Sequence, residues 1–391
     1  MLSLDSRGCF PRFLPMVVLV VVALFSAAPL AAASGGRPDP LFRIIAYVRG
    51  NAMDIEQYPL QHLTHINYCF LHLKGNTLVL GGERDSIAIS RLVALKKVHP
   101  GLKVLFSVGG WGGCEPCSGV FAAADGRHEF AISALELLQH FGADGIDLDW
   151  EYPAIEGYPG HPYSGADRHN FTLLVAELRK VLGNGYEVTF AGGGFLKFLK
   201  ESVEWDQVMP LVDYVNVMSY DLVNGYSTVT GHHTSLYSTP RQMESTDFAV
   251  RFLDSLGVPP QKIVIGAAFY ARVWQDVKPG NNGLFQEGKF TSYVRFNQFD
   301  EIFGTGSSFT TYWDSTARAP YAYDSTNRLF ATFDDRQSVA LKTEYAIHKG
   351  LGGIMFWELT GDLRENGLLT TMANTALRSP RPRQRPPDQP K

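Results

Sequence analysis

The chain has 391 residues, of which 45% are hydrophobic and 19% are charged, and its formal net charge is -4. This is the composition of a globular protein with room for one large domain or two smaller ones. Basic side chains gather in the C-terminal segment 378–391, so the rest of the chain is more acidic than the total suggests. An acidic surface repels phosphate backbones, which excludes a nucleic-acid partner and leaves neutral glycans possible.

The N-terminus has the pattern of an export signal. Arg7 and Arg12 precede an apolar run over 13–30, and three alanines at 31–33 offer a small-residue cleavage site. The alternative is a retained membrane anchor, because the run is about as long as a bilayer span, although prolines interrupt both of its ends. We therefore predict a signal peptide over 1–33 and a secreted or periplasmic protein that has no membrane segment after cleavage.

Short apolar runs rich in β-branched residues alternate with amphipathic stretches from residue 43 onwards. We expect strands over 43–48, 65–71, 103–108, 145–151, 187–191, 214–220, 263–270 and 353–358. Helices are expected between them, over 86–98, 127–141, 167–182, 246–256 and 338–348.

Eight strands that alternate with helices predict an α/β protein with a (β/α)8 TIM barrel. An open doubly wound sheet is the alternative, but it requires a Gly-rich phosphate turn after the first strand, which this sequence lacks. The long interval after the seventh strand is rich in aromatic residues, and structureless loops of such length are uncommon in compact domains. We predict a barrel domain over 34–377, a small α+β insertion over 273–337 between strand 7 and helix 7, and a disordered Pro/Arg-rich tail over 378–391.

Four cysteines bear on the redox compartment, and Cys9 leaves with the predicted signal peptide. Cys69 lies in an apolar predicted strand and is expected to be a buried free thiol. Cys114 and Cys117 form a C-x-x-C in a Gly-rich loop. A structural zinc site would need two more ligands at suitable spacing, so in an exported protein we favour a local disulfide over a metal or redox role.

The segment 144–153 carries the chemistry. At a period of two, its apolar residues face one side of the predicted strand, and Asp147, Asp149 and Glu151 face the other, towards the barrel interior. Neighbouring carboxylates in one site cannot all ionise, so a proton is held among them and one pKa rises. Glu151, the last of the three, can then donate a proton to a leaving oxygen near neutral pH. The alternatives are an exposed acidic strand and a Mg²⁺ or Ca²⁺ site. The apolar residues on the other face disfavour an exposed strand, and the absence of carbonyl or amide ligands in the pattern disfavours a metal site.

The pattern Asp144-x-x-Asp147-x-Asp149-x-Glu151 resembles the D-x-x-D-x-D-x-E signature of glycoside hydrolase family 18, the chitinases. Further segments resemble family motifs in the same order along the chain: 68–70 (Y-A-F), 107–111 (S-x-G-G), 218–221 (M-x-Y-D), 269–272 (F-Y-G-R, with Ala271 in place of glycine) and the eighth-strand tryptophan Trp357. The resemblance covers residues 43 to about 375. The first strand, 46–50, departs from the family pattern, so the resemblance does not extend to the subsites for the non-reducing end.

The resemblance implies hydrolysis of β-1,4-linked N-acetylglucosamine polymers or oligomers, chitin and chito-oligosaccharides, by a retaining mechanism in which the substrate's own acetamido group is the nucleophile. It implies catalytic roles for Glu151, Asp149, Asp147 and Tyr220. It implies substrate contacts for Tyr68, Phe70, Gly110, Trp111, Met218, Asp221, Arg272 and Trp357, and an insertion that forms one wall of the cleft. No cofactor or metal ion is expected, and we expect a monomer. The alternatives are a hydrolase of another N-acetylglucosamine glycan, such as an N-glycan core or peptidoglycan, and a chitin-binding lectin-like protein.

Overall fold

The computed structural model describes residues 42–50 and 54–379. The predicted signal peptide and almost all of the predicted tail lie outside these residues. Arg378, which we assigned to the tail, is the last residue of a helix, because the face of that helix that packs on the core continues up to Ala376. No helix in the described part of the chain is long and apolar enough to cross a lipid bilayer.

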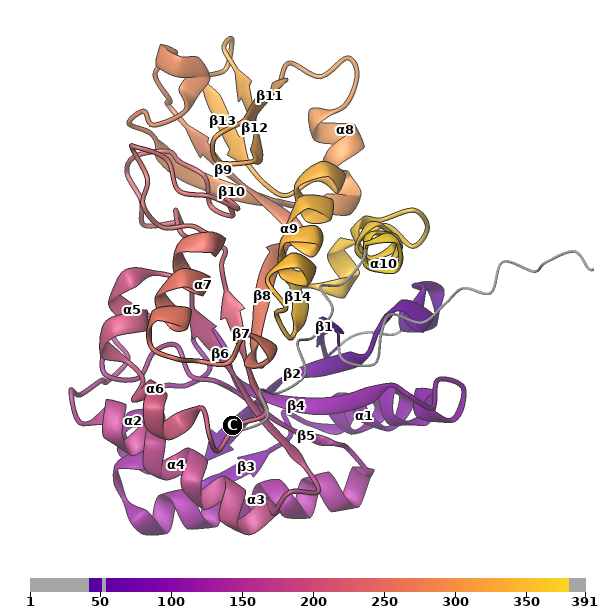
Figure 1. The fold of residues 1–391 in the computed structure, drawn as a ribbon, viewed down its shortest axis with the longest axis vertical. Helices are drawn as coiled ribbons and strands as arrows, with labels where there is room; N and C mark the ends of the chain where they lie inside the picture. The colour runs from indigo at the N-terminus through magenta and orange to yellow at the C-terminus, as the bar shows by residue number, and fades with distance from the viewer. Residues whose placement is uncertain (1–41, 51–53, 380–391) are drawn as a thin grey trace, which may run out of the picture. The chain divides into compact units, whose positions relative to one another are not determined.

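Eight parallel strands close on themselves as a barrel, which confirms the predicted fold class (Figure 1). The strands are β1 (Arg43–Arg49), β2 (His65–Lys74), β4 (Lys103–Gly109), β5 (Gly145–Asp149), β6 (Glu187–Gly193), β7 (Tyr214–Met218), β8 (Ile263–Ala268) and β14 (Gly353–Trp357). Pairing of β1 with both β2 and β14 completes the ring. A short strand, β3 (Thr77–Val79), extends β2 as an antiparallel hairpin that the sequence pattern missed.

Helices follow the barrel strands, and the predicted ones begin and end within a few residues of the observed ones. They are α1 (Glu83–Ala94), α2 (Cys117–Ala122), α3 (Ala124–Phe141), α4 (Asp167–Leu182), α5 (Leu196–Glu201), α6 (Trp205–Val208), α7 (Thr246–Ser255), α9 (Arg336–His348) and α10 (Leu368–Arg378). Single 3₁₀ turns lie at Ile55–Gln57, Leu60–His62, Leu95–Lys97, Pro260–Lys262, Gly280–Gly283, Phe296–Gln298 and Leu359–Gly361. The short helices α2, α5 and α6 escaped prediction because they span too few turns to show a clear period.

A second, antiparallel sheet lies between β8 and α9 in the chain, in the order β10-β9-β13-β12-β11. Its elements are β9 (Tyr270–Gln275), β10 (Lys289–Arg295), α8 (Phe299–Phe303), β11 (Thr310–Asp314), β12 (Ala319–Asp324) and β13 (Leu329–Thr332). Trp274, Tyr321, Tyr323 and Phe330 form its own small core. The strand predicted over 263–270 therefore ends at Ala268, and Tyr270 already belongs to the insertion.

The barrel buries apolar side chains on both faces of its strands, as parallel sheets do. On the outer face of β5, Ile146 and Leu148 belong to the large core that the helices cover. Trp150, directly after the strand, packs on the same side against Phe121 of α2 and Phe171 of α4. This packing leaves the alternate residues of the segment, the carboxylates, to point into the barrel.

An ion network closes the opposite, N-terminal end of the barrel. The Glu187 carboxylate accepts hydrogen bonds from Lys103, from Tyr214 at 3.2 Å and from His65 at 3.1 Å. Burial alone would raise the pKa of Glu187, but the hydrogen bonds and charges of His65 and Lys103 lower it to about 2. The network ties β2, β4, β6 and β7 together at the end remote from the cleft described below.

Replacing Glu187 with Gln should lower the free energy of unfolding by about 1.5–3 kcal/mol at pH 7, the range for a hydrogen bond to a charged group. Because the folded-state pKa of Glu187 lies below its ordinary value of 4.5, this stabilisation is present above about pH 5 and is lost as the pH falls towards 2. Denaturant unfolding at pH 7 and pH 3 measures both effects. Glu287→Gln, which removes an exposed pair with Lys278, is the control and should change little; equal losses at both pH values would contradict the prediction.

Candidate active site

A cleft of about 1770 Å³ opens at the C-terminal ends of the barrel strands. Residues in the C-terminal parts of the barrel strands β1, β2, β4, β5, β7 and β14, or in the loops that follow the barrel strands, line it. The insertion adds Phe290, Tyr293 and Arg295 from β10. Tyr293 is 60% exposed, so its ring is available to a ligand, whereas Trp274, Tyr321 and Tyr323 are buried within the insertion. This end of a TIM barrel is where such enzymes carry their active sites.

The acidic side chains of β5 rise towards this cleft. Asp147 is fully buried beneath it, Asp149 is almost fully buried and lines it, and Glu151 follows the strand and keeps part of its surface open to it. The period-two pattern of the sequence therefore places all three on one side of the strand. Gly145 begins the strand where β5 and β6 approach so closely that any side chain would collide with the backbone of Glu187.

Four donors surround the buried carboxylate of Asp147. Its Oδ2 accepts hydrogen bonds from the Tyr47 hydroxyl at 2.8 Å and the Ser107 hydroxyl at 2.9 Å. Its Oδ1 accepts from the Thr189 hydroxyl at 2.6 Å and from Nδ2 of Asn216 at 3.0 Å. Burial raises the pKa of Asp147, and these donors oppose the rise because they favour the charged form.

Asp149 and Glu151 have fewer partners. Oδ1 of Asp149 is buried and has no hydrogen-bond partner among the described residues. Burial, followed by the charges of Glu151 and Asp147, raises the pKa of Asp149 well above its ordinary value. Burial raises the pKa of Glu151 to about 7, with a hydrogen bond from Tyr152 opposing and the charge of Asp221 adding to the rise. This part of the cleft can therefore hold a proton at neutral pH.

Asp221 is held by the base of the insertion. Both Nε and Nη2 of Arg272 donate to its carboxylate, and the Tyr270 hydroxyl donates to Oδ1 at 2.8 Å. Burial would raise the pKa of Asp221, but Arg272 and His233 reverse this and hold it well below its usual range. Asp221 is therefore a fixed negative charge beside Glu151, and Arg272, which also lines the cleft, is its counter-ion.

Aromatic and thioether side chains complete the floor and sides of the cleft. Trp357 and Phe70 stack with ring centroids 5.6 Å apart and an interplanar angle of 16°. Tyr220 lies beside Tyr270, and its hydroxyl lies 3.7 Å from Sδ of Met355. Met218 also lines the cleft.

A second group of aromatic side chains surrounds Trp111. Its ring is 47% exposed and lies 5.6 Å from Tyr158, 6.2 Å from Tyr226 and 6.4 Å from Tyr152, centroid to centroid. These residues come from three different loops. Flat exposed rings that line a cleft are suited to the apolar faces of sugars.

Two expected contact residues do not reach the cleft. Tyr68 is fully buried, and its hydroxyl donates to Asp85 at 2.8 Å; Asp85, which also accepts from the amide of Gly81 at 2.6 Å, lines the cleft instead. Gly110 has a positive φ of 76°, and any Cβ at this position would collide with the ring of Phe70. Both residues shape the walls and do not contact the space inside them.

Sequence reasoning missed the residues that surround Asp147, apart from Ser107, which lies in the motif at 107–111. Tyr47, Thr189 and Asn216 come from strands far apart in the chain. The available signal was weak: each is a polar residue in an otherwise apolar strand segment. Among the described residues no group of His, Cys, Asp and Glu side chains has the arrangement of a metal site.

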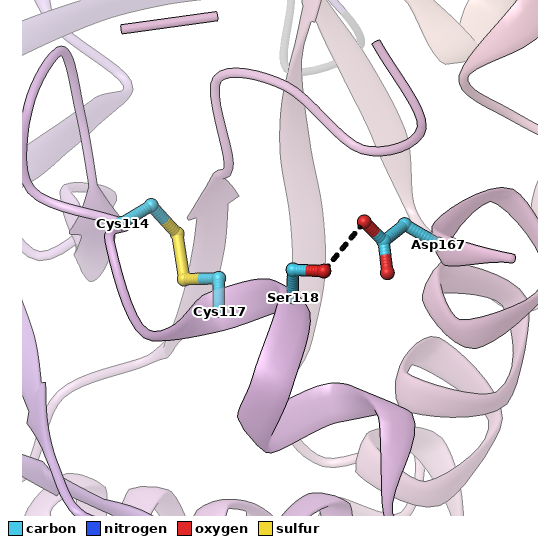
Figure 2. Close-up of a disulfide and its surroundings, with 4 residues drawn as sticks. All are labelled: Cys114, Cys117, Ser118 and Asp167. Carbon is cyan, nitrogen blue, oxygen red and sulfur yellow. Dashed lines mark hydrogen bonds between the residues drawn. A yellow bond between two sulfur atoms is a disulfide. The ribbon is translucent and has the colours of Figure 1, made fainter. Parts of the chain in front are cut away.

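A disulfide joins Cys114, in the loop after β4, to Cys117, the first residue of α2 (Figure 2). The hydroxyl of Ser118, the residue after Cys117, donates a hydrogen bond to the carboxylate of Asp167 in α4 at 2.8 Å (Figure 2). The amide of Gly110 donates to the carbonyl of Asp149 at 2.8 Å. The loop that presents Trp111 is therefore tied both to α4 and to the acidic strand, while Cys69 is a buried free thiol.

Comparison with known proteins gives a consistent result. The sequence profile "Glycosyl hydrolases family 18" matches residues 43–362. The chain is 35% identical to Chitinase A1 of Niallia circulans over 299 residues, 70% of this chain and 42% of that protein. It is 29% identical to Chitinase B of Serratia marcescens over 381 residues, 80% of this chain and 76% of that protein. A family 18 N-acetylglucosaminidase from Paenibacillus barengoltzii superposes with a TM-score of 0.78 at 34% identity, covering 85% of this chain and 99% of that structure.

Mass spectrometry of protein digested without reduction should yield Cys114 and Cys117 joined in one peptide, and alkylation of the unfolded, unreduced protein should modify Cys69. Reduction before alkylation, which should add label at both loop cysteines, is the control. Free thiols at Cys114 and Cys117 in the unreduced sample would contradict the disulfide and restore a metal or redox role for the loop.

Proposed function

The chain belongs to glycosyl hydrolase family 18 and is a glycoside hydrolase, and we propose that it hydrolyses the β-1,4 linkages of chitin and of chito-oligosaccharides. The proposed mechanism is retaining and substrate-assisted, with Glu151 as the general acid and base. The observation that carries this proposal is Glu151 at the edge of the cleft with a pKa raised to about 7, next to Asp149 and Asp147 on the same side of one segment.

In the first step the protonated Glu151 carboxyl gives its proton to the glycosidic oxygen, and the bond from that oxygen to the anomeric carbon breaks. The carbonyl oxygen of the substrate's acetamido group forms a new bond to the anomeric carbon, which gives an oxazolinium ion. In the second step the Glu151 carboxylate takes a proton from water while the water oxygen bonds to the anomeric carbon. The bond from that carbon to the acetamido oxygen breaks, which restores the acetamido group and gives net retention. Family 18 enzymes are known exceptions to the rule of a second carboxylate nucleophile, and the geometry here is compatible with that chemistry.

Asp149 is suited to bind the acetamido N–H and to balance the developing positive charge. Its Oδ1 has no hydrogen-bond partner in the described protein, and an unpartnered buried oxygen favours a ligand donor. The carboxyl of Asp147 lies below it, where four donors favour the charged form. The hydroxyl of Tyr220 lines the same space and would hold the acetamido oxygen in position for attack, a proximity effect.

The aromatic side chains suggest where the sugars lie. Trp357, stacked on Phe70, would form the floor under the sugar that is attacked. Trp111 and Tyr226, which also line the cleft, would then contact the leaving part of the chain. Met218, Asp221 and Arg272 would line the pocket of the attacked sugar, and Tyr293 of the insertion would form part of the wall.

Two alternatives belong to the same architecture. A hydrolase of N-glycan cores or peptidoglycan would use the same acetamido chemistry, and a lectin-like protein would use the cleft only for binding. The open cleft and its exposed rings favour an unbranched chain, and the presence of Glu151, Asp149 and Tyr220 together favours catalysis. The product profiles from chitohexaose and from an N-glycan core distinguish all three, because a lectin would leave both substrates intact.

Glu151→Gln should lower kcat by at least about 10³-fold while the affinity for chitohexaose stays within about threefold, because the amide keeps the shape of the side chain but has no acidic proton. Initial rates and calorimetric binding measure the two quantities. Glu136→Gln, on the exposed face of α3, is the matched control and should behave like wild type.

The wild-type rate should also fall as the pH rises through about 7. The raised pKa keeps Glu151 protonated up to that value, and the acid form is lost above it. Near-normal turnover of Glu151→Gln, or a rate that stays constant up to pH 9, would remove Glu151 from the role of acid.

A thiazoline analogue of the oxazolinium ion should inhibit competitively and bind at least about 10²-fold more tightly than the matching substrate, because it resembles the intermediate. Fully deacetylated chitosan oligomers and cellohexaose, which lack the nucleophile, should remain uncut under the same conditions. Isolation of a covalent bond between the sugar and an aspartate of the protein would exclude the substrate-assisted route.

A further inference from the structure

One oxygen of Asp147 accepts its hydrogen bonds only from β6 and β7, the next two strands of the barrel after β5. Thr189 of β6 and Asn216 of β7 donate to Oδ1 at 2.6 Å and 3.0 Å. In the sheet register Thr189 is the β6 partner of Asp147, and Ser107 is its β4 partner. Neither Thr189 nor Asn216 lines the cleft, so neither can contact a substrate directly.

The rest of the fold offers no other reason for these two polar side chains. Both are fully buried in a barrel interior, a place that usually holds bulky aliphatic residues. Oδ1 of Asn216 has no hydrogen-bond partner among the described residues, so the contact with Asp147 is what orients this amide. The Thr189 hydroxyl has one further acceptor within reach, the carbonyl of Ile146 at 3.5 Å, and the shorter distance assigns its proton to Asp147.

We propose that Thr189 and Asn216 are positioning residues for the reaction: they hold Oδ1 of Asp147 so that this carboxylate stays charged and correctly turned beneath Asp149 and Glu151. The inference rests on the proposed function. Both oxygens of Asp147 already have two donors each, which favours the carboxylate form. A charged Asp147 keeps the proton of the acidic segment on the residues above it, where the chemistry takes place.

The titratable groups that face Asp147 come from four strands. They are Tyr47 on β1, Cys69 on β2, Asp149 on β5 and Tyr214 on β7. Burial raises the pKa of the two tyrosines and of the thiol, so all three are neutral near pH 7. The carboxyl groups of Asp147, Asp149 and Glu151 therefore account for the pH dependence of the interior.

The test uses Thr189→Val, which keeps the shape of the side chain and removes the donor, and Asn216→Leu, which does the same for the amide. Either variant should lower kcat for chitohexaose about tenfold, the factor given by about 1.4 kcal/mol of lost transition-state stabilisation, with KM within about twofold. The acid limb of kcat/KM should move up by about one pH unit, because an Asp147 with fewer donors takes up a proton at higher pH.

Thr189→Ser, which keeps the hydroxyl, should restore both the rate and the pH profile. Thr343→Val in α9, which removes a buried hydroxyl that donates to the carbonyl of Val339, is the control for stability alone. A loss of stability in Thr189→Val and Asn216→Leu with an unmoved pH profile would show that the two residues are merely structural and would overturn the proposal.

A second measurement needs no turnover. Infrared titration of protein labelled with ¹³C-aspartate should show one buried carboxyl taking up its proton at higher pH in Thr189→Val than in wild type or Thr189→Ser. Identical titrations in all three proteins would overturn the inference. A wild-type protein that leaves chitohexaose uncut would refute the proposed function instead, and the infrared comparison would still decide the role of Thr189.

Discussion

The burial of a carboxylate at Asp147 is the constraint on which the active-site end of the barrel depends. A charge removed from water is stable only if its lost hydrogen bonds are replaced. Here the replacements come from Tyr47, Ser107, Thr189 and Asn216, on four strands that are distant in the chain. A shift of register in any of these strands would move its donor to the other face of the sheet, so the charge also specifies how the barrel closes.

The three acidic side chains differ in how many hydrogen-bond partners their carboxyl oxygens have. Asp147 has two donors on each oxygen, Asp149 has one buried oxygen without a partner, and Glu151 opens to the cleft. The environment thus changes within one short segment from a buried carboxyl with four donors to a group at the cleft that can gain and lose a proton. Pairs of carboxyl groups whose surroundings push their pKa values apart are the usual arrangement for acid and base catalysis.

The insertion uses its aromatic residues for two purposes. Trp274 and Tyr321 lie in its core, whereas Tyr293 on β10 faces the cleft. Arg272 on β9 links the insertion to the barrel through an ion pair, because its guanidinium is the counter-ion of the Asp221 carboxylate after β7. The insertion therefore contributes to the electrostatics beside Glu151 as well as to the wall of the cleft.

Local patterns in the sequence were sufficient for the number of barrel strands, the main helices, the presence of an insertion and the orientation of Asp147, Asp149 and Glu151. Each of these follows from a period of two or 3.6 over a few residues, which neighbouring positions alone determine. The same patterns placed the ends of four strands, expected over 145–151, 214–220, 263–270 and 353–358, one or two residues too late, and they put Arg378 in the tail.

What only the tertiary structure decided is which residues meet. Tyr68 and Gly110 lie within conspicuous motifs, yet one supports Asp85 and the other makes room for Phe70. The carboxylate of Asp147 meets Thr189 and Asn216 only because the register of the strands brings them together. The carboxylate of Asp221 meets Arg272 only because the first strand of the insertion begins beside the end of β7. These depend on the sum of many weak contacts between distant segments, which no local period in the sequence records.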